Sequence, residues 1–256
     1  MTTSNAAVTG HTDPRLQKLP TAKIVRRQDY TEDLFKIWIE PSVPFSFRPG
    51  QYITIGSQNI ERPYSIASAP YEAEIELFIE HVLPEHGGKL TPLLYAQHVG
   101  DIVSMRPRPK GIFTLDERYT DHVLVGTVTG VAPYVSYVRQ FLHDGKSGHR
   151  FWVMEGASHW DEFIYDEEFI DLSKAHDFIK FVPTVSRPNA ERNKDWQGPT
   201  GRVNTIVEEY VESWGLAKEN TLLYLCGNPG MIEDVKERMG TKGWNYTEER
   251  FWKEDE

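Results

Sequence analysis

The tetrapeptide Arg62-Pro63-Tyr64-Ser65 brings several chemistries together. An arginine can hold a diphosphate through two charge-assisted hydrogen bonds, and a tyrosine ring can stack on a flat heterocycle. A serine hydroxyl or backbone amide can reach a ring nitrogen. An ordinary strand with an edge proline has the same residue types, so that alternative stays open for the tetrapeptide alone. The combination makes it a candidate site for a ligand with a diphosphate and a flat ring.

Two other segments have residues that suit phosphate oxygens. Gly88-Lys89-Leu90-Thr91 indicates a turn into a helix, whose free amides and Thr91 hydroxyl could hold phosphate. Thr127-Val128-Thr129-Gly130 follows an apolar run and precedes a helical pattern at Pro133, which is where open parallel sheets bind nucleotides. No Gly-Lys-Ser/Thr sequence follows, so this segment is not a Walker loop. A plain turn is the alternative for each segment.

The framework around the tetrapeptide is expected to be antiparallel. From residue 21 to about residue 115, short alternating runs are separated by Pro-Gly and Gly-Asp turn signals. This spacing predicts an antiparallel barrel or sandwich, to which we assign residues 20–117. The expected strands lie at 22–28, 34–40, 51–57, 74–82 and 101–107. Residues 1–19 lack periodicity, so we expect a mobile N-terminal segment there.

The pattern changes after residue 119, where apolar runs are each followed by an amphipathic helical pattern. The strands are expected at 122–127, 150–157, 178–186 and 221–228, and the helices at 133–144, 161–173, 203–215 and 230–240. Alternating strands and helices predict a parallel sheet covered on both faces. We assign this α/β domain residues 118–256, which gives a two-domain fold class.

Composition narrows the possible functions. A chain of 256 residues, 39% of them hydrophobic, is long enough for two domains with cores. Its net charge of −10 repels a phosphate backbone, so we expect no nucleic-acid partner. The one cysteine excludes an intramolecular disulfide and a four-cysteine cluster, and the nine histidines show no metal-ligand spacing, so we expect no metal. The polar start and the lack of a membrane-length apolar stretch predict a cytoplasmic protein without membrane contact.

Taken together, these segments and their order resemble the ferredoxin–NADP⁺ reductase family, in particular its bacterial ferredoxin/flavodoxin–NADP⁺ reductases. The resemblance extends over about residues 20–256. Later markers at family-like spacing add to it, namely Gly156-Ala157, Val185-Ser186-Arg187, Gly201-Arg202, Cys226-Gly227-Asn228-Pro229 and an aromatic pair near the C-terminus. The resemblance implies an antiparallel FAD-binding β-barrel followed by an α/β NADP-binding domain.

For FAD, the resemblance implies that the Arg62-Pro63-Tyr64-Ser65 run binds the cofactor. Arg62 would bind the diphosphate, Tyr64 would stack on the flavin, and Ser65 would contact its N5 edge. The other expected diphosphate contacts are Gly88, Lys89, Leu90 and Thr91. Phe251 would lie beside the isoalloxazine and Trp252 beside the adenine, with a hydrophobic latch on the barrel as the alternative for this pair.

For NADP, the resemblance implies a site that includes Thr127, Thr129, Gly130, Pro133 and Asn228. Arg187 and Arg202 would hold the adenosine 2′-phosphate, which favours NADP over NAD. Each arginine could instead be a solvated surface charge, and Arg192 and Lys194 could substitute for them.

Two further residues stand near the expected nicotinamide and pyrophosphate. Cys226 would flank the nicotinamide, and we favour a packing role over thiolate chemistry because hydride transfer needs no nucleophile. The family usually has glycine where Val128 stands. A β-branched side chain there restricts the backbone, so we expect altered NADP affinity or pose.

The implied reaction is redox. NADPH gives a hydride to FAD N5, and the reduced flavin passes single electrons to ferredoxin or flavodoxin, or the sequence runs in reverse. The basic stretch Arg106-Pro107-Arg108-Pro109-Lys110 could dock an acidic carrier or remain a solvated rim. Two alternatives stay open: the reductase component of an oxygenase system, and a non-catalytic flavin-binding regulatory subunit. We expect a monomer.

Overall fold

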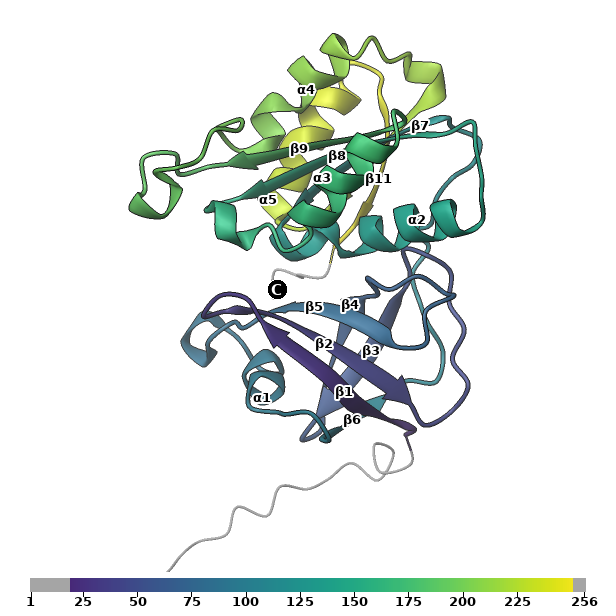
Figure 1. Cartoon of the computed structure of the whole chain (residues 1–256), viewed down its shortest axis with the longest axis vertical. Coiled ribbons are helices and arrows are strands. Elements are labelled where there is room, and N and C mark those ends of the chain that lie inside the picture. Colours follow the sequence, from purple (N-terminus) through teal and green to yellow (C-terminus); the bar gives the residue numbers. More distant parts are fainter. Residues whose placement is uncertain (1–18, 251–256) are drawn as a thin grey trace, which may run out of the picture.

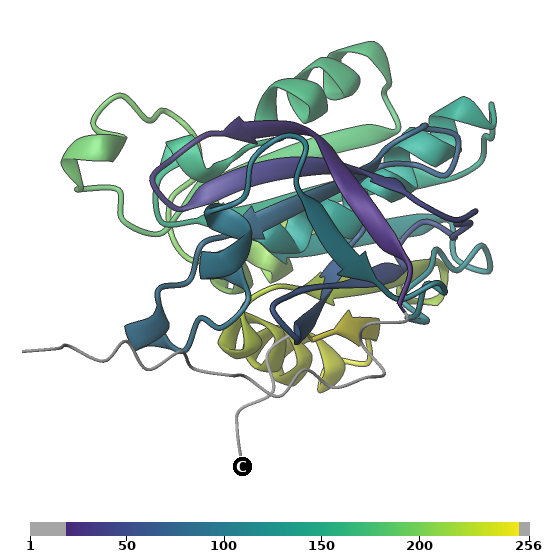
Figure 2. The same cartoon turned by 90° about the horizontal axis from the view of Figure 1, so that it is seen from below.

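The structure, a computed structural model, describes residues 19–250. It contains two sheets, which lie one above the other along the long axis of the molecule (Figure 1). Seen from below, the strands of the first sheet lie in front of the strands and helices of the second (Figure 2). The two-domain fold class predicted from the sequence is confirmed.

The first sheet has six antiparallel strands in the order β4-β3-β6-β1-β2-β5. They are β1 (Thr21–Asp29), β2 (Leu34–Pro41), β3 (Tyr52–Ser57), β4 (Ile60–Ser65), β5 (Ile75–Glu80) and β6 (Ile102–Met105). The 3₁₀ turn η2 (Pro84–His86) and the short helix α1 (Thr91–Tyr95) connect β5 to β6. Because side chains alternate along a strand, one face can supply a core, which includes Ile37, Ile53 and Leu77.

The second sheet has five parallel strands in the order β11-β10-β7-β8-β9. They are β7 (Asp121–Thr127), β8 (Arg150–Ala157), β9 (Ile179–Val185), β10 (Thr221–Cys226) and β11 (Asn245–Glu249). The chain runs outward from β7 to β8 and β9 and then returns to β10 on the other side of β7. The strand order therefore reverses between β7 and β10, and open α/β sheets bind ligands at the carboxyl ends of such strands.

Helices cover both faces of the parallel sheet. Helices α2 (Ala132–His143) and α3 (Asp166–Ala175) pack on one face, and α4 (Val203–Ser213) and α5 (Pro229–Val235) pack on the other. Leu124 belongs to the core under α2 and α3, whereas its neighbours Val123 and Val125 belong to the core under α4 and α5. The short elements are η3 (Val128–Val131), η4 (Trp160–Glu162), η5 (Glu191–Asn193), η6 (Lys218–Asn220) and the π-helical η7 (Lys236–Gly240).

The structure differs from the expected elements in several places. The helix expected at 161–173 is divided into η4 and α3, and the helix expected at 230–240 is divided into α5 and η7. Strands β4 and β11 are additional to the expected ranges. Within residues 19–250, none of the helices combines the length and apolar character needed to cross a membrane.

Candidate active site

A cavity, here called the inner cavity, lies between the two sheets. Strand β4, the end of β5 and the turn before α1 line it from the first sheet, and η3 with the end of β10 lines it from the second. The residues singled out from the sequence that line it are Arg62, Pro63, Tyr64, Ser65, Gly88, Lys89, Leu90, Thr91, Thr129, Gly130 and Cys226. The fold thus brings four separate segments of the chain to one cavity.

Strand β4 presents the tetrapeptide to the inner cavity through its antiparallel pairing with β3, where Ser65 lies opposite Tyr52. The Ser65 side chain is buried, and its Oγ has no hydrogen-bond partner within the described residues. A buried hydroxyl without a partner is unfavourable, so this atom suits a ligand that supplies one. Burial raises the pKa of Tyr64 far above its usual range, and Arg62 only partly opposes this shift. The buried Tyr64 side chain thus stays protonated, and its ring lines the inner cavity.

The turn before α1 is tightly folded against the end of β5. A side chain at Gly88 would place its Cβ 1.7 Å from the Val82 carbonyl oxygen, so this position requires glycine. The Thr91 hydroxyl donates to the Val82 carbonyl at 3.1 Å and accepts from the Val82 amide at 3.0 Å. The Thr91 hydroxyl is thus engaged with Val82 in this structure, and its contact with a phosphate stays a prediction. Lys89 is the basic side chain of this turn that lines the cavity.

The segment after β7 packs closely on the segment after β10. A Cβ at Gly130 would lie 2.3 Å from the Cys226 carbonyl oxygen, and a Cβ at Gly227 would lie 2.2 Å from Thr127 Oγ1. Gly227 also has a φ of +119°, and the Asn228 amide donates to Thr127 Oγ1 at 2.8 Å. These contacts form the floor of the crevice between β7 and β10. The Asn228 side chain caps α5 by accepting from the Met231 amide at 3.2 Å.

Val128 has a φ of +45°, in the left-handed region that favours glycine. Its partly buried side chain packs against both the core under α2 and α3 and the small cluster of Ala157, Phe163 and Val185. The sequence analysis noted that valine stands here where the family usually has glycine. The backbone has the left-handed conformation that a β-branched residue rarely adopts.

Cys226 ends β10 at the inner cavity and is fully buried. Burial raises the pKa of its thiol well above the usual range, so the group stays protonated. This agrees with a packing role rather than thiolate chemistry.

Glu249 lies beside Cys226, its register partner on β11, and was missed in the sequence analysis. Burial raises the pKa of Glu249 to about 8, and Oε2 has no hydrogen-bond partner within the described residues. The polar β11 sequence gives no apolar alternation, so only the position at a strand end next to Cys226 could have indicated this carboxyl.

A second cavity, here called the outer cavity, opens along the parallel sheet. Its lining includes Thr127, Val128, Arg187, Arg202 and Asn228 from the expected set. The side chains of Arg187 and Arg202 make no hydrogen bond or ion pair with any residue in the range 19–250, whereas the two alternative cations are engaged. Arg192 pairs with Asp161 at 2.7 Å and Lys194 pairs with Glu191 at 3.0 Å.

The two cavities adjoin, since Glu80, Thr129 and Gly227 line both. Pro133 lines neither cavity and is buried in the first turn of α2, where a proline suits helix initiation. Phe251 and Trp252 lie outside the described residues.

The donor set fits two dinucleotides on chemical grounds. The inner cavity combines an orphaned hydroxyl, a neutral aromatic ring and basic side chains, which suits a flavin with a diphosphate. The outer cavity combines a glycine-containing crevice with two arginines that have no partner within the described part of the chain, which suits a phosphorylated nicotinamide dinucleotide.

Comparison with known proteins points the same way. Residues 124–237 match the family described as an oxidoreductase NAD-binding domain. The chain is 29% identical to the flavodoxin/ferredoxin–NADP reductase of Escherichia coli K12, over 84% of this chain and 88% of that protein. It is 30% identical to ferredoxin–NADP reductase B of Sorangium cellulosum, over 75% of this chain and 79% of that protein.

Two further similarities concern a different electron-transfer system and the fold. The chain is 31% identical to the reductase component of the naphthalene 1,2-dioxygenase system of Pseudomonas putida, over 82% of this chain and 61% of that protein. A ferredoxin NADP⁺ reductase from Neisseria gonorrhoeae, solved with bound FAD and NADP, shares the fold with a TM-score of 0.79. The two chains are 23% identical in sequence, and the match covers 92% of this chain and 99% of the Neisseria chain.

Proposed function

Because this chain belongs to the ferredoxin–NADP⁺ reductase family, we propose that it is an FAD-dependent oxidoreductase that exchanges electrons between NADPH and ferredoxin or flavodoxin. The observation that carries the proposal is the junction of the two cavities at Thr129 and Gly227, with the unpartnered Ser65 hydroxyl in the inner one. This arrangement suits two ligands that meet where the sheets face each other.

In this proposal the inner cavity holds FAD. Arg62 and Lys89 balance the charge of its diphosphate, the neutral Tyr64 ring stacks on its flat ring system, and Ser65 supplies a hydroxyl to the ring edge. When bound, the flavin supplies the chemistry, because it can accept two electrons as a hydride and release them one at a time. The protein aligns the reactants and shields them from water.

The outer cavity holds NADPH. Arg187 and Arg202 are placed to bind the 2′-phosphate through charge-assisted hydrogen bonds, and the close-packed crevice at Gly130 and Gly227 lets the pyrophosphate approach the backbone. The protonated thiol of Cys226 packs beside the nicotinamide.

The basic stretch after β6 is a candidate docking site for the electron carrier. Arg108 and Lys110 precede Ile112, whose side chain is 94% exposed, while Arg106 is engaged with Glu61 at 2.6 Å. A basic rim around an exposed apolar residue suits an acidic carrier, even though this chain carries a net charge of −10. We place this activity on a monomer in the cytoplasm, a compartment in which the one cysteine stays reduced.

A second candidate function is the reductase component of an oxygenase system, which the similarity to the Pseudomonas protein favours. Both candidates use the same cavities and differ in the carrier that receives the electrons. A flavin-binding subunit without turnover would instead bind FAD but fail to oxidise NADPH.

The experiment is purification of the full chain followed by steady-state assays. We expect yellow protein with one noncovalent FAD and NADPH-dependent reduction of a ferredoxin or flavodoxin. Faster electron transfer to an oxygenase ferredoxin would select the second candidate. Protein that stays colourless after incubation with FAD and FMN would refute both.

A further inference from the structure

Strand β5 presents its two faces to different parts of the molecule. Leu77 and Ile79 belong to the core of the first sheet, whereas Glu76, Phe78 and Glu80 lie on the opposite face. Phe78 packs in the core of the second sheet, with its ring edge-on to Tyr165 at 5.7 Å between centroids. Glu80 lines both cavities. One strand of the first sheet therefore contacts both the second domain and the candidate active site.

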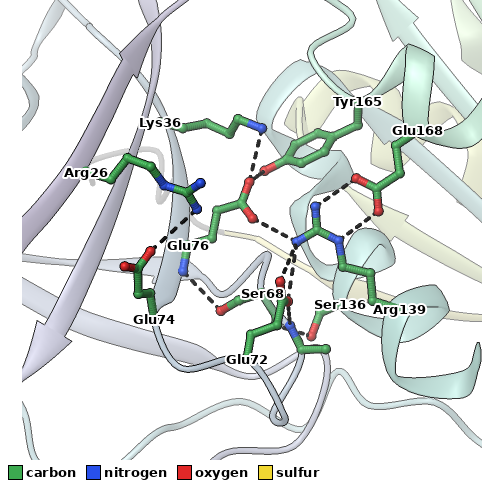
Figure 3. A network of polar contacts seen from close by, with 11 residues as sticks. Arg26, Lys36, Ser68, Glu72, Glu74, Glu76, Ser136, Arg139, Tyr165 and Glu168 are labelled. Atoms are coloured by element: carbon green, nitrogen blue, oxygen red, sulfur yellow. Dashed lines mark hydrogen bonds and ion pairs between the residues drawn. The ribbon is translucent and has the colours of Figure 1, made fainter. Parts of the chain in front are cut away.

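The carboxylate of Glu76 is buried at this interface and is bound from both domains (Figure 3). From the first sheet, Lys36 Nζ lies 3.1 Å from Oε1. From the second domain, Tyr165 Oη donates to Oε1 at 2.9 Å and Arg139 Nη1 donates to Oε2 at 2.7 Å. Burial by itself would raise the pKa of Glu76, but Arg139 and Lys36 outweigh it and hold the pKa below its usual range. The carboxylate is therefore ionised.

Arg139 connects three elements from its position on α2. Its Nε and Nη2 atoms form a two-pronged pair with Glu168 on α3, both at 2.7 Å. Its Nη1 atom reaches Glu76 and lies 3.4 Å from Glu72, which belongs to the loop before β5. We call Lys36, Glu72, Glu76, Arg139, Tyr165 and Glu168 the interface cluster. A second link lies beside it, where Ser136 Oγ donates to the Ser68 carbonyl at 2.8 Å.

Such a cluster contributes geometry more than stability. Removing charges from water is unfavourable, and buried ion pairs are often replaced by apolar residues without loss of stability. Ion pairs with several directed hydrogen bonds, however, are satisfied in one arrangement only. The interface cluster therefore fixes how β5 lies against α2 more sharply than apolar packing alone would.

Both elements lead from the cluster to the candidate active site. Along β5, Glu76 is followed by the cavity residues Phe78 and Glu80, about 7 and 13 Å away at a strand rise of about 3.3 Å per residue. Along α2, Arg139 lies about 10 Å from the cavity residue Ala132 at a rise of about 1.5 Å per residue. Strand β5 and helix α2 are regular elements of different domains. Contacts that hold them together at the interface cluster therefore also set their separation at the inner cavity.

We propose that Arg139 and Glu76 are positioning residues, which set the distance between the flavin in the inner cavity and the nicotinamide that enters from the outer cavity. The inference rests on the proposed function. Neither residue lines either cavity, so both act through β5 and α2. Hydride transfer depends steeply on the separation of the reacting atoms, so a small change in the angle between the domains would slow it.

The test compares the FAD-loaded enzyme with two variants. Arg139→Gln removes the central cation, and the combination of Lys36→Met, Glu76→Leu and Arg139→Met replaces the buried charges by apolar side chains. Lys146→Gln, which breaks an exposed pair with Glu117, is the matched control. The measurements are the rate of flavin reduction by NADPH without oxygen, the melting temperature, and calorimetric affinities for NADP⁺ and for 2′,5′-ADP. The last ligand has no nicotinamide, so it reports on the second domain alone.

We expect both variants to reduce the flavin about 10- to 100-fold more slowly, with weaker NADP⁺ charge-transfer absorbance. Affinity for 2′,5′-ADP and FAD content should stay at the values of the unmodified enzyme, and the triple variant should melt no lower. If Arg139→Gln does not fold, the triple variant decides. Unchanged reduction rates in a folded variant, or a loss matched by weaker 2′,5′-ADP or FAD binding, would overturn the inference. An unmodified enzyme that does not reduce FAD with NADPH would instead refute the proposed function.

Discussion

At the scale of single residues, the candidate site contains side chains whose positions are unfavourable unless a ligand or a function compensates. Val128 holds a left-handed backbone conformation, which is unfavourable by about 1–2 kcal/mol for a residue with a Cβ. The buried Ser65 hydroxyl has no hydrogen-bond partner among residues 19–250. Arg187 and Arg202 face the outer cavity without counter-charges in the described part of the chain. Such features gather at binding sites, where a bound group can satisfy them.

Val128→Gly should lower the KM for NADPH, because glycine adopts this φ without strain and leaves more room beside the pyrophosphate path. Steady-state kinetics check the change. Gln58→Gly is the matched control, since Gln58 also has a positive φ of 49° but lies in the turn between β3 and β4, away from both cavities. An unchanged or higher KM would mean that the turn has adapted to valine.

Arg187→Ala and Arg202→Ala should each lower kcat/KM for NADPH by about 10- to 100-fold, because each removes hydrogen bonds to a charged group worth about 1.5–3 kcal/mol. Activity with NADH should change little, since NADH has no 2′-phosphate. Arg192→Ala, whose side chain is paired with Asp161, is the control. Equal kcat/KM values for NADPH and NADH in the unmodified enzyme would show that neither arginine binds the phosphate.

Glu155→Gln should stabilise the protein increasingly as the pH rises. Glu155 is fully buried on β8, and neither carboxyl oxygen has a partner among the described residues. Burial, with a smaller effect of Asp166, raises the pKa of Glu155 well above its usual range. The unfolded chain loses this proton above about pH 4.3, whereas the folded protein keeps it, so stability falls as the pH rises from there toward the folded-state pKa.

Denaturant unfolding from about pH 5 to about pH 9 measures this effect. The exposed Glu167→Gln is the control. A constant difference in unfolding free energy between Glu155→Gln and the unmodified protein across this range would contradict the prediction.

At the scale of elements, the sequence predicts best those strands and helices that bury apolar faces. The runs at 122–127 and 150–157 lie within a residue of β7 and β8, because continuous apolar runs mark strands that are covered on both sides. Strand β11 has the polar sequence Asn-Tyr-Thr-Glu-Glu and is held by its edge pairing with β10, so its pattern gives no signal. The break between η4 and α3 is likewise set by tertiary packing of Phe163 and Tyr165, both buried.

Truncation after Arg250 tests the expected roles of Phe251 and Trp252, which stay predictions. Strand β11 ends at Glu249 beside Cys226, next to the inner cavity. Loss of the two aromatic residues should weaken FAD retention, because stacked rings stabilise by about 0.5–1.5 kcal/mol beyond area burial. It should also strengthen NADP⁺ charge-transfer absorbance, since a competing ring is removed. Unchanged FAD retention and absorbance would indicate a latch on the barrel.

At the scale of the whole molecule, the site exists only where the two domains meet. Local motifs, such as the tetrapeptide on strand β4 and the glycine-containing turn after β7, could be proposed from the sequence because their residue types carry the chemistry. The pairing of Glu76 with Arg139 could not, because these residues are 63 positions apart and each is an ordinary charged residue in its own segment. Nor could the pKa of Glu249, which depends on burial between elements. Contacts between residues far apart in the sequence therefore determine the domain interface and the shifted pKa values, which the local motifs do not indicate.

In the proposed function, NADPH in the outer cavity reduces FAD in the inner cavity. The most direct measurement is rapid mixing of the FAD-loaded full-length protein with NADPH in the absence of oxygen, followed through the flavin absorbance. We expect the absorbance to bleach in a single turnover and to return when a one-electron acceptor is added, with two equivalents of acceptor consumed for each NADPH. Flavin that stays oxidised in the presence of saturating NADPH would contradict the account.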